Sequence, residues 1–132
     1  MRTKPTLTAA DVKTMMAACE AKAVSSGWAV SIAIVDDGGF LLGLHRMDGA
    51  GLVTAEAAIG KARTSALTKR PSKVFEDRVK ERPAFIGFPA GLFIQGALPL
   101  MHQNDCVGAI GVSGVQSAED EQVAQAGADT LG

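Results

Sequence analysis

Four residues whose side chains can do chemistry stand together in the stretch LGLHRMDGAG, where an apolar run meets a glycine-rich turn. His45 offers an imidazole that can bind a metal or form hydrogen bonds. Arg46 can hold a carboxylate in a bidentate pair. Met47 offers an apolar surface, and Asp48 offers a carboxylate for proton transfer. The stretch predicts one wall of a ligand site, although a turn in which Arg46 simply pairs with Asp48 has the same sequence.

The chain has a second histidine, His102, which ends another apolar run just before the turn at 103–105. Neither histidine has a second one at metal-ligand spacing, and three or four local ligands for a zinc ion are missing. No metal site is therefore expected. A lone histidine can still be an axial ligand of haem iron. The alternative for His45 and His102 is a hydrogen-bonded imidazole at the end of a strand.

An alanine-rich helix is expected directly after the His45 stretch. Its first turn offers free N–H groups to an anion. The helix carries Glu56, Lys61 and Arg63, and such charges are typical of a solvated face. Glu56 is the candidate among them for moving a proton in an enzyme.

Residues 81–92 (ERPAFIGFPAGL) contain two prolines and two glycines. They predict a long ordered loop, a kind of segment that often carries function in a small protein. Phe85 and Phe88 are its candidate pocket-lining side chains.

Other familiar site patterns are absent. The glycines of 108–114 lie inside an apolar run and miss the spacing of a nucleotide-binding loop, so they predict close packing within a strand. Ser113 lacks the surroundings of a nucleophile elbow. Cys19 and Cys106 stand in apolar company and are expected to be buried, reduced thiols.

The elements that position these residues follow from periodicity and turn signals. Thr8 and Asp11 form a capping box for a helix that ends before Gly27. The Asp36–Gly39 turn (DDGG) predicts a hairpin. Pro71 is expected in the first turn of a further helix, and Ser117, with Asp120 three residues on, is expected to cap the last one. The expected elements are a helix over 9–26, strands over 28–35 and 40–46, a helix along 52–66, the helix from Pro71, strands over 93–101 and 106–113, and the helix from Ser117.

The resulting order is α-β-β-α-α-β-β-α. The hairpin connections predict an α/β fold of the α+β kind, a central antiparallel sheet flanked by helices. The length fits one domain over residues 1–132.

Composition excludes two classes of partner. Net charge is −1 with no run of like charges, which argues against nucleic acid. No apolar run approaches the roughly 20 residues of a membrane span. The first residues lack an apolar signal segment, so the cytoplasm is the expected compartment.

Several stretches together resemble one family. They are RMDGA (46–50), KARTSAL (61–67), GALPL (96–100), and VGAIGVSG (107–114) followed by EDE (119–121). From about residue 8 to residue 131, the chain is similar to GlcG/HbpS-like proteins, which include haem-binding and haem-degrading members and resemble the C-terminal domain of PduO-type corrinoid adenosyltransferases. Where the family usually has Gly-Gly before LPL, this chain has Gly96-Ala97, and the extra methyl narrows any pocket there.

The resemblance implies a profilin-like fold, assembly into homodimers or larger homo-oligomers, and haem or another small planar ligand as guest. His45, His102, Met47, Phe85 and Phe88 are then the candidate haem contacts. The pocket would be completed by the 81–92 loop and a neighbouring subunit.

Some members of the family look like lyases acting on hydroxylamino-substituted benzoates. The resemblance therefore implies a second hypothesis, an enzyme in which Arg46 binds the substrate carboxylate and Asp48 or Glu56 moves protons. A third hypothesis is a structural or regulatory oligomer without small-molecule chemistry.

Overall fold

The computed structural model describes residues 1–132 and contains four helices, a short 3-10 helix and four strands. In chain order the elements are α1 (Ala9–Ser26), β1 (Ser31–Asp36), β2 (Leu41–Arg46), α2 (Thr54–Thr68), α3 (Ser72–Glu81), the 3-10 helix η1 (Pro83–Gly87), β3 (Ala97–His102), β4 (Asp105–Ser113) and α4 (Ser117–Ala128). The predicted α-β-β-α-α-β-β-α order and the α+β class are confirmed.

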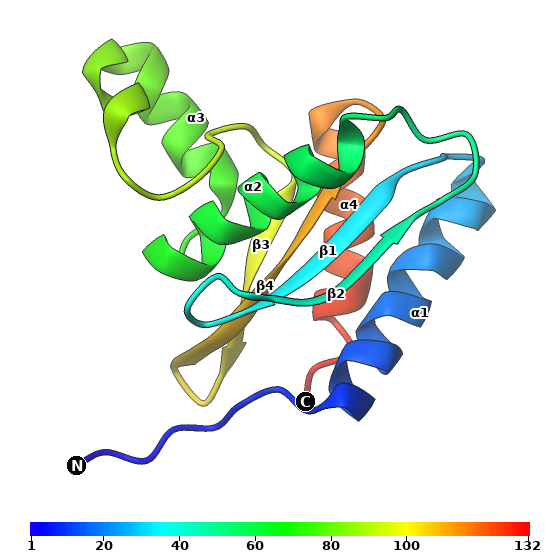
Figure 1. The fold of residues 1–132 in the computed structure, drawn as a ribbon, viewed down its shortest axis with the longest axis horizontal. Coiled ribbons are helices and arrows are strands. Elements are labelled where there is room, and N and C mark those ends of the chain that lie inside the picture. Colours follow the sequence, from blue (N-terminus) through cyan, green and yellow to red (C-terminus); the bar gives the residue numbers. More distant parts are fainter.

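The four strands form one antiparallel sheet in the order β2-β1-β4-β3. Helices α1 and α4 pack together on one face, and α2 lies alone across the other (Figure 1). Helix α3 and η1 project from the end of the sheet near β3 (Figure 1). We call these two elements, residues 72–87, the α3–η1 arm. None of the helices has the length and hydropathy that crossing a bilayer requires.

Local signals set the first elements as the sequence predicts. The Thr8 hydroxyl accepts a hydrogen bond from the Asp11 N–H at 3.2 Å, and the Asp11 carboxylate accepts one from the Thr8 N–H at 2.8 Å, which is a reciprocal capping box. In the β1–β2 turn, Asp36 Oδ1 accepts from the N–H groups of Gly38 and Phe40, each at 2.9 Å. Gly39 takes a φ of 82° there, which glycine adopts without strain.

The face under α1 and α4 carries the larger core. It holds twelve buried residues, most of them large aliphatic side chains such as Ile32, Ile110 and Val123. Gly127 of α4 lets this helix approach α1 closely, since a Cβ at this position would collide with the Cys19 sulfur. This face is therefore sealed by two helices and large side chains.

The face under α2 carries a thin core made mostly of alanine: Ala33, Val35, Ala58, Ala62, Ala66 and Ala109. A Cβ on Gly111 of β4 would collide with the α2 backbone at Ala58 and Ala62. The predicted close packing of this glycine run is thus confirmed, and small residues bring α2 close to the sheet.

Two predicted element boundaries are wrong. The strand expected from Phe93 begins only at Ala97, because backbone N–H groups just before it point to α3. The N–H of Gln95 donates to the Glu76 carboxylate at 3.3 Å, and that of Ala97 to the Ser72 hydroxyl at 3.0 Å. The strand expected from Trp28 begins at Ser31, because the Trp28 N–H closes the end of α1 on Ala23.

The predicted cap of α4 is also wrong. Gln116 and Glu119 form the capping box in place of Ser117 and Asp120. Asp120 does not take part in this cap, because its side chain is buried and forms an ion pair with Lys61.

Candidate functional site

The His45 stretch forms one wall of a shallow hollow of about 290 Å³ lined by Glu20, Val24, His45, Met47 and Asp48. The register places His45 opposite Ile32, on the α1 side of β2. Its Nε2 lies 3.8 Å from a carboxylate oxygen of Glu20 on α1. The carboxylates of Glu20 and Asp48 make this hollow acidic, and its use as a ligand site stays a prediction.

His102 lies in a different hollow of about 240 Å³, where the two ends of the chain meet beside β3 and β4. Its Nδ1 lies 2.9 Å from the Gly132 carbonyl oxygen. The apolar lining comes from Pro5, Leu7, Val107 and Leu131.

The carboxylate of Asp11 also lies in the lining of this hollow, where it accepts hydrogen bonds from Thr8 in the capping box. These hydrogen bonds hold the pKa of Asp11 below its usual value. As long as Asp11 is ionised, its carboxylate remains hydrogen-bonded to Thr8 at the N-terminus of α1.

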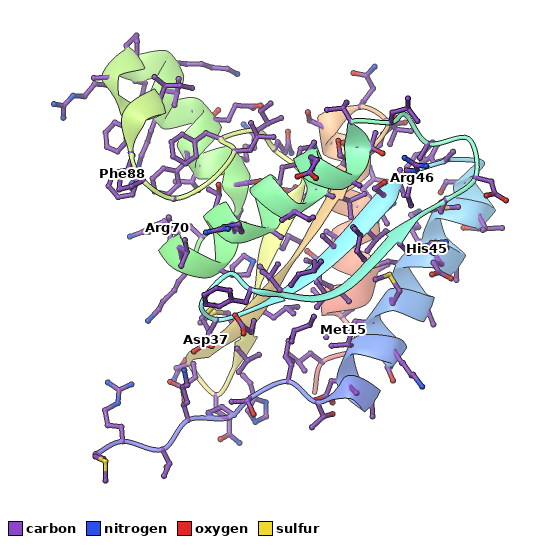
Figure 2. The ribbon with its side chains drawn as sticks, in the orientation of Figure 1. Met15, Asp37, His45, Arg46, Arg70 and Phe88 are labelled. Carbon is purple, nitrogen blue, oxygen red and sulfur yellow. The ribbon has the colours of Figure 1, made fainter.

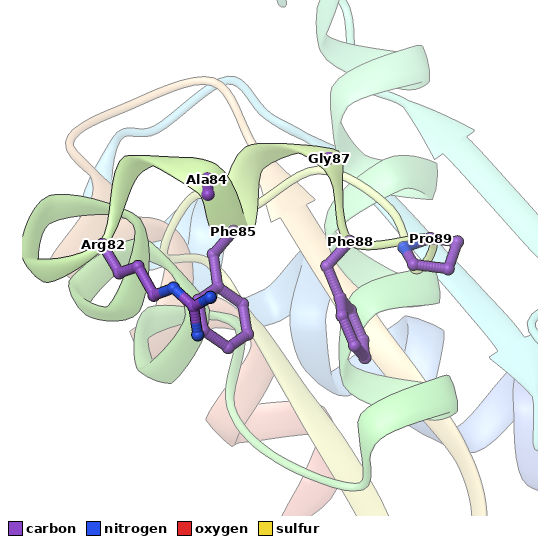
Figure 3. Close-up of a pocket in the computed structure, with 6 residues that line it drawn as sticks. All are labelled: Arg82, Ala84, Phe85, Gly87, Phe88 and Pro89. Carbon is purple, nitrogen blue, oxygen red and sulfur yellow. The ribbon is translucent and has the colours of Figure 1, made fainter.

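The α3–η1 arm contains the third hollow, of about 340 Å³, lined by Arg82, Ala84, Phe85, Gly87, Phe88 and Pro89 (Figure 3). Phe85 and Phe88 lie with ring centroids 5.9 Å apart, and both rings contact Phe75 of α3. The Arg82 guanidinium lies 5.7 Å from the centre of the Phe85 ring. Phe85 and Phe88 thus line this hollow, and their contact with a ligand stays a prediction.

The expected single pocket, with the 81–92 loop closing over the His45 stretch, is wrong within one chain. Figure 2 places Phe88 and His45 at opposite ends of the molecule. The loop is held away because its phenylalanines pack on Phe75, whose own ring is anchored on the buried Phe93 at 5.3 Å. The candidate haem contacts thus fall into three separate hollows.

The candidate catalytic residues are not brought together either. Arg46 faces the α2 side of β2, opposite Ser31, whereas Asp48 lines the His45 hollow on the other side. Arg46, Asp48 and Glu56 are exposed and form no ion pair with one another or with other residues. The alternative of an Arg46–Asp48 pair is therefore wrong as well.

The expectation that Lys61 belongs to a solvated face is also wrong. Its side chain is 4% exposed, and Nζ lies 3.2 Å from Asp120 Oδ2 and 3.0 Å from the Val112 carbonyl oxygen. Burial raises the pKa of Asp120, although the Val115 N–H and Lys61 oppose this shift. Lys61 lies on the same face of α2 as the buried alanines Ala58 and Ala62. This spacing is the signal in the sequence that could have predicted a buried ammonium group.

Cys19 is buried, as expected, whereas the expectation of a buried Cys106 is wrong, because this thiol is only partly buried. Burial raises the pKa of Cys19 to about 12 and also raises that of the half-buried Cys106. A raised pKa opposes formation of the thiolate, which is the nucleophilic form of cysteine. No group of three or more His, Cys, Asp or Glu side chains is arranged to hold a metal ion.

Known proteins resemble this chain over nearly its whole length. GlcG from Escherichia coli is 40% identical over 114 residues, covering 86% of this chain and 85% of GlcG. The crystal structure of HbpS matches 100% of this chain and 94% of HbpS with a TM-score of 0.93 and 34% identity. The crystal structure of a PduOC–haem complex matches 96% of each chain with a TM-score of 0.88 and 25% identity.

The family model described as haem degrading protein HbpS-like matches residues 7–129. This span includes α1 through α4 and every strand of the sheet. The chain belongs to the family of HbpS-like haem degrading proteins.

Proposed function

We propose that this protein binds haem and that His102 supplies the axial ligand. The observation that carries the proposal is the contact of 2.9 Å between His102 Nδ1 and the Gly132 carbonyl oxygen. With the proton on Nδ1, this contact is a hydrogen bond that leaves the lone pair of Nε2 free. Histidines that bind metals are commonly oriented by such a bond from the other ring nitrogen to a carbonyl or carboxylate.

The surroundings of His102 suit an apolar macrocycle. Four apolar residues line its hollow, and the Asp11 carboxylate in the lining is engaged at the start of α1. The hollow of about 240 Å³ is smaller than the roughly 300–1,000 Å³ of typical small-molecule sites. One chain would therefore contact only part of a tetrapyrrole ring through this hollow.

His45 is the weaker candidate for the ligand. Its side chain is 48% exposed, and the hollow beside it contains the carboxylates of Glu20 and Asp48. These negative charges disfavour the propionate groups of haem by like-charge repulsion. His45 therefore serves as the matched control for His102.

The test is a haemin titration followed by the Soret absorbance, with wild type, His102→Ala and His45→Ala. We expect saturation in wild type and His45→Ala, and weakened, non-saturating binding in His102→Ala. Loss of binding in His45→Ala alone would move the ligand to His45. Free haemin and albumin serve as reference samples. Weak binding that neither substitution changes would overturn the proposed haem site.

The structure favours a second candidate, binding of an aromatic carboxylate, at a place other than Arg46. The arm hollow combines the rings of Phe85 and Phe88 with Arg82, and no carboxylate lies within ion-pair distance of that guanidinium. Stacking and a charged hydrogen bond together suit such a ligand. No acid or base lines the hollow, so it supports binding rather than lyase chemistry.

Calorimetric titration with benzoate and 4-hydroxylaminobenzoate tests this candidate. Arg82→Gln should weaken binding about 10- to 100-fold, which corresponds to a charged hydrogen bond of about 1.5–3 kcal/mol. Arg46→Gln is the matched control and should leave affinity unchanged. Equal affinity in wild type and Arg82→Gln would exclude the arm hollow.

A further inference from the structure

The α3–η1 arm and the segment that follows it gather most of the aromatic rings of the protein. Four of the five phenylalanines, Phe75, Phe85, Phe88 and Phe93, form one set of contacts with ring centroids 5.3–6.2 Å apart. Phe75 and Phe93 are buried and fix the positions of the two outer rings. Phe85 is half-buried and Phe88 is exposed, and both line the arm hollow. The hollow therefore has aromatic walls that are in place before a ligand arrives.

The size of the arm hollow also suits a small ligand. Its volume of about 340 Å³ falls within the roughly 300–1,000 Å³ of typical small-molecule sites, whereas the other two hollows are smaller than this range. Figure 3 shows the Arg82 guanidinium beside the Phe85 ring, with the Phe88 ring further along η1. A flat ligand body that contacts these rings has a cation at its side.

A second arginine lies at the same ring. The guanidinium carbon of Arg82 lies 5.7 Å from the centre of the Phe85 ring, and that of Arg78 lies 5.9 Å from it. Arg78 also lies 4.8 Å from the centre of the Phe75 ring, so its side chain packs against the aromatic cluster. Two permanent positive charges are thus presented beside one wall of the hollow.

These two arginines have no counter-charge within the chain. None of the ion pairs includes Arg78 or Arg82. The two lysines of α3 each pair with a carboxylate of the same helix, at Asp77 and Glu76, so these carboxylates are already engaged. Like charges at positions i and i+4 repel each other along a helix. An anion bound beside both guanidinium groups would offset this repulsion.

The charge of the surrounding segment favours an anion as well. Residues 69–82 contain six of the thirteen Lys and Arg residues but only three of the fourteen Asp and Glu residues. This segment therefore has a net charge of +3, whereas the whole chain has a net charge of −1. A local excess of one sign of charge attracts ligands of the opposite sign. The excess is large enough to favour a ligand with more than one negative charge.

A phosphate monoester combines these requirements. It carries a charge of about −1.5 to −2 at pH 7 on one compact group with three acceptor oxygens, and guanidinium groups bind phosphate in bidentate pairs. A carboxylate has one charge, for which one arginine suffices. We propose that the arm hollow binds a planar aromatic molecule bearing a phosphate monoester, with its ring on Phe85 and Phe88 and its phosphate held by Arg78 and Arg82.

This inference rests on the binding of an aromatic anion in the arm hollow, which is proposed above, and adds the charge of that anion and a second arginine. Calorimetric titration of wild type with phenyl phosphate, benzoate and inorganic phosphate tests it. Phenyl phosphate should bind at least about 10-fold more tightly than benzoate, which has one charge fewer, and than inorganic phosphate, which has no ring.

The probes separate failure of this inference from failure of the proposed function. Benzoate that binds as tightly as phenyl phosphate would overturn the preference for a phosphate and leave the aromatic carboxylate site in place. Inorganic phosphate that binds as tightly as phenyl phosphate would overturn the inference, because the rings would then take no part. Absence of binding by all three probes would overturn both.

Replacement of Arg78 distinguishes the two kinds of anion. Arg78→Gln should weaken phenyl phosphate about 10- to 100-fold and leave benzoate, which pairs with Arg82, within about twofold. Arg63→Gln, an exposed arginine of α2 without an ion pair, is the matched control and should change neither affinity. Since Arg78 packs on Phe75, circular dichroism checks the fold, and Arg78→Lys should keep more affinity than Arg78→Gln. A folded Arg78→Gln with wild-type affinity, or an equal loss in Arg63→Gln, would overturn the inference.

A pH series gives a readout that needs no variant. The second pKa of a phosphate monoester is about 6, so phenyl phosphate changes from a dianion to a monoanion between about pH 7.5 and about pH 5. Both guanidinium groups keep their charge over this range. The affinity for phenyl phosphate should fall about 10-fold as pH is lowered, whereas that for benzoate should not. A constant affinity for phenyl phosphate, or an equal fall for both probes, would overturn the requirement for a dianion.

Discussion

The two faces of this sheet solve the same packing problem differently. On the α1/α4 face, large aliphatic side chains fill the space between the sheet and two helices. On the other face, alanines bring α2 close to the sheet, and a buried Lys61–Asp120 pair joins α2 to α4 beside the last residues of β4. The first face is thus filled within one chain, whereas the second combines a thin alanine core with an ion pair and leaves side chains of β2 exposed.

The largest expected effect comes from breaking the ion pair of the thin face. Lys61→Met leaves the Asp120 carboxylate buried without its cation, and we expect a loss of about 3–5 kcal/mol in the free energy of unfolding. Urea denaturation measures this loss. The double variant Lys61→Met/Asp120→Leu should recover most of it, because no buried charge remains. A single-variant cost below about 1 kcal/mol would show that the pair does not stabilise this face.

The second prediction compares the stability cost of shortening Ile32, in the core under α1 and α4, with that of shortening Leu44 on β2. Ile32 is completely buried and Leu44 is 41% exposed. Ile32→Ala should cost about 2–5 kcal/mol, and Leu44→Ala within about 0.5 kcal/mol when the chain is dilute. Urea denaturation at low and high protein concentration measures both. If Leu44→Ala is as costly as Ile32→Ala in dilute protein, β2 is covered within one chain.

The smallest expected effect is the dependence of the free energy of unfolding on pH that arises from Asp120. Its folded-state pKa is raised, above all by burial, so the folded chain keeps this proton at pH values where the unfolded chain has lost it. The stability from Asp120 is therefore full below its unfolded pKa of about 3.9 and is lost as pH rises through the raised value. Relative to Asp120→Asn, wild type should gain stability as pH falls from 7 towards 4. Thermal unfolding measures the difference in stability between wild type and Asp120→Asn. A difference that stays constant, or that grows as pH rises, would contradict this prediction.

Much of the fold could be predicted because its signals are local. The DDGG turn, the Thr8–Asp11 box and alternation in β4 depend on neighbours in the sequence. The late start of β3 could not be predicted, because it depends on Ser72 and Glu76 of α3 receiving backbone N–H groups from a distant segment. The role of Asp120 was hidden for the same reason, since Lys61 is 59 positions away.

The residues of the candidate site could be named, but their grouping could not. His45, Met47 and Asp48 share a hollow because they are neighbours in sequence. Phe85 and Phe88 were expected beside them, and the structure sets them on α3 through Phe75. The contact of His102 with the backbone oxygen of Gly132 leaves no pattern in the sequence, because no side chain of Gly132 takes part in it.

Rescue of haem ligation by free imidazole tests whether His102 is the axial ligand. His102→Gly removes the proposed ligand and leaves space for imidazole, and His45→Gly is the control. Electron paramagnetic resonance and Soret spectra of the ferric complexes should show a histidine-ligated iron in wild type and His45→Gly. We expect His102→Gly to lose this signature and to regain it when imidazole is added. An unchanged spectrum in His102→Gly without imidazole would contradict the assignment of His102 as the haem ligand.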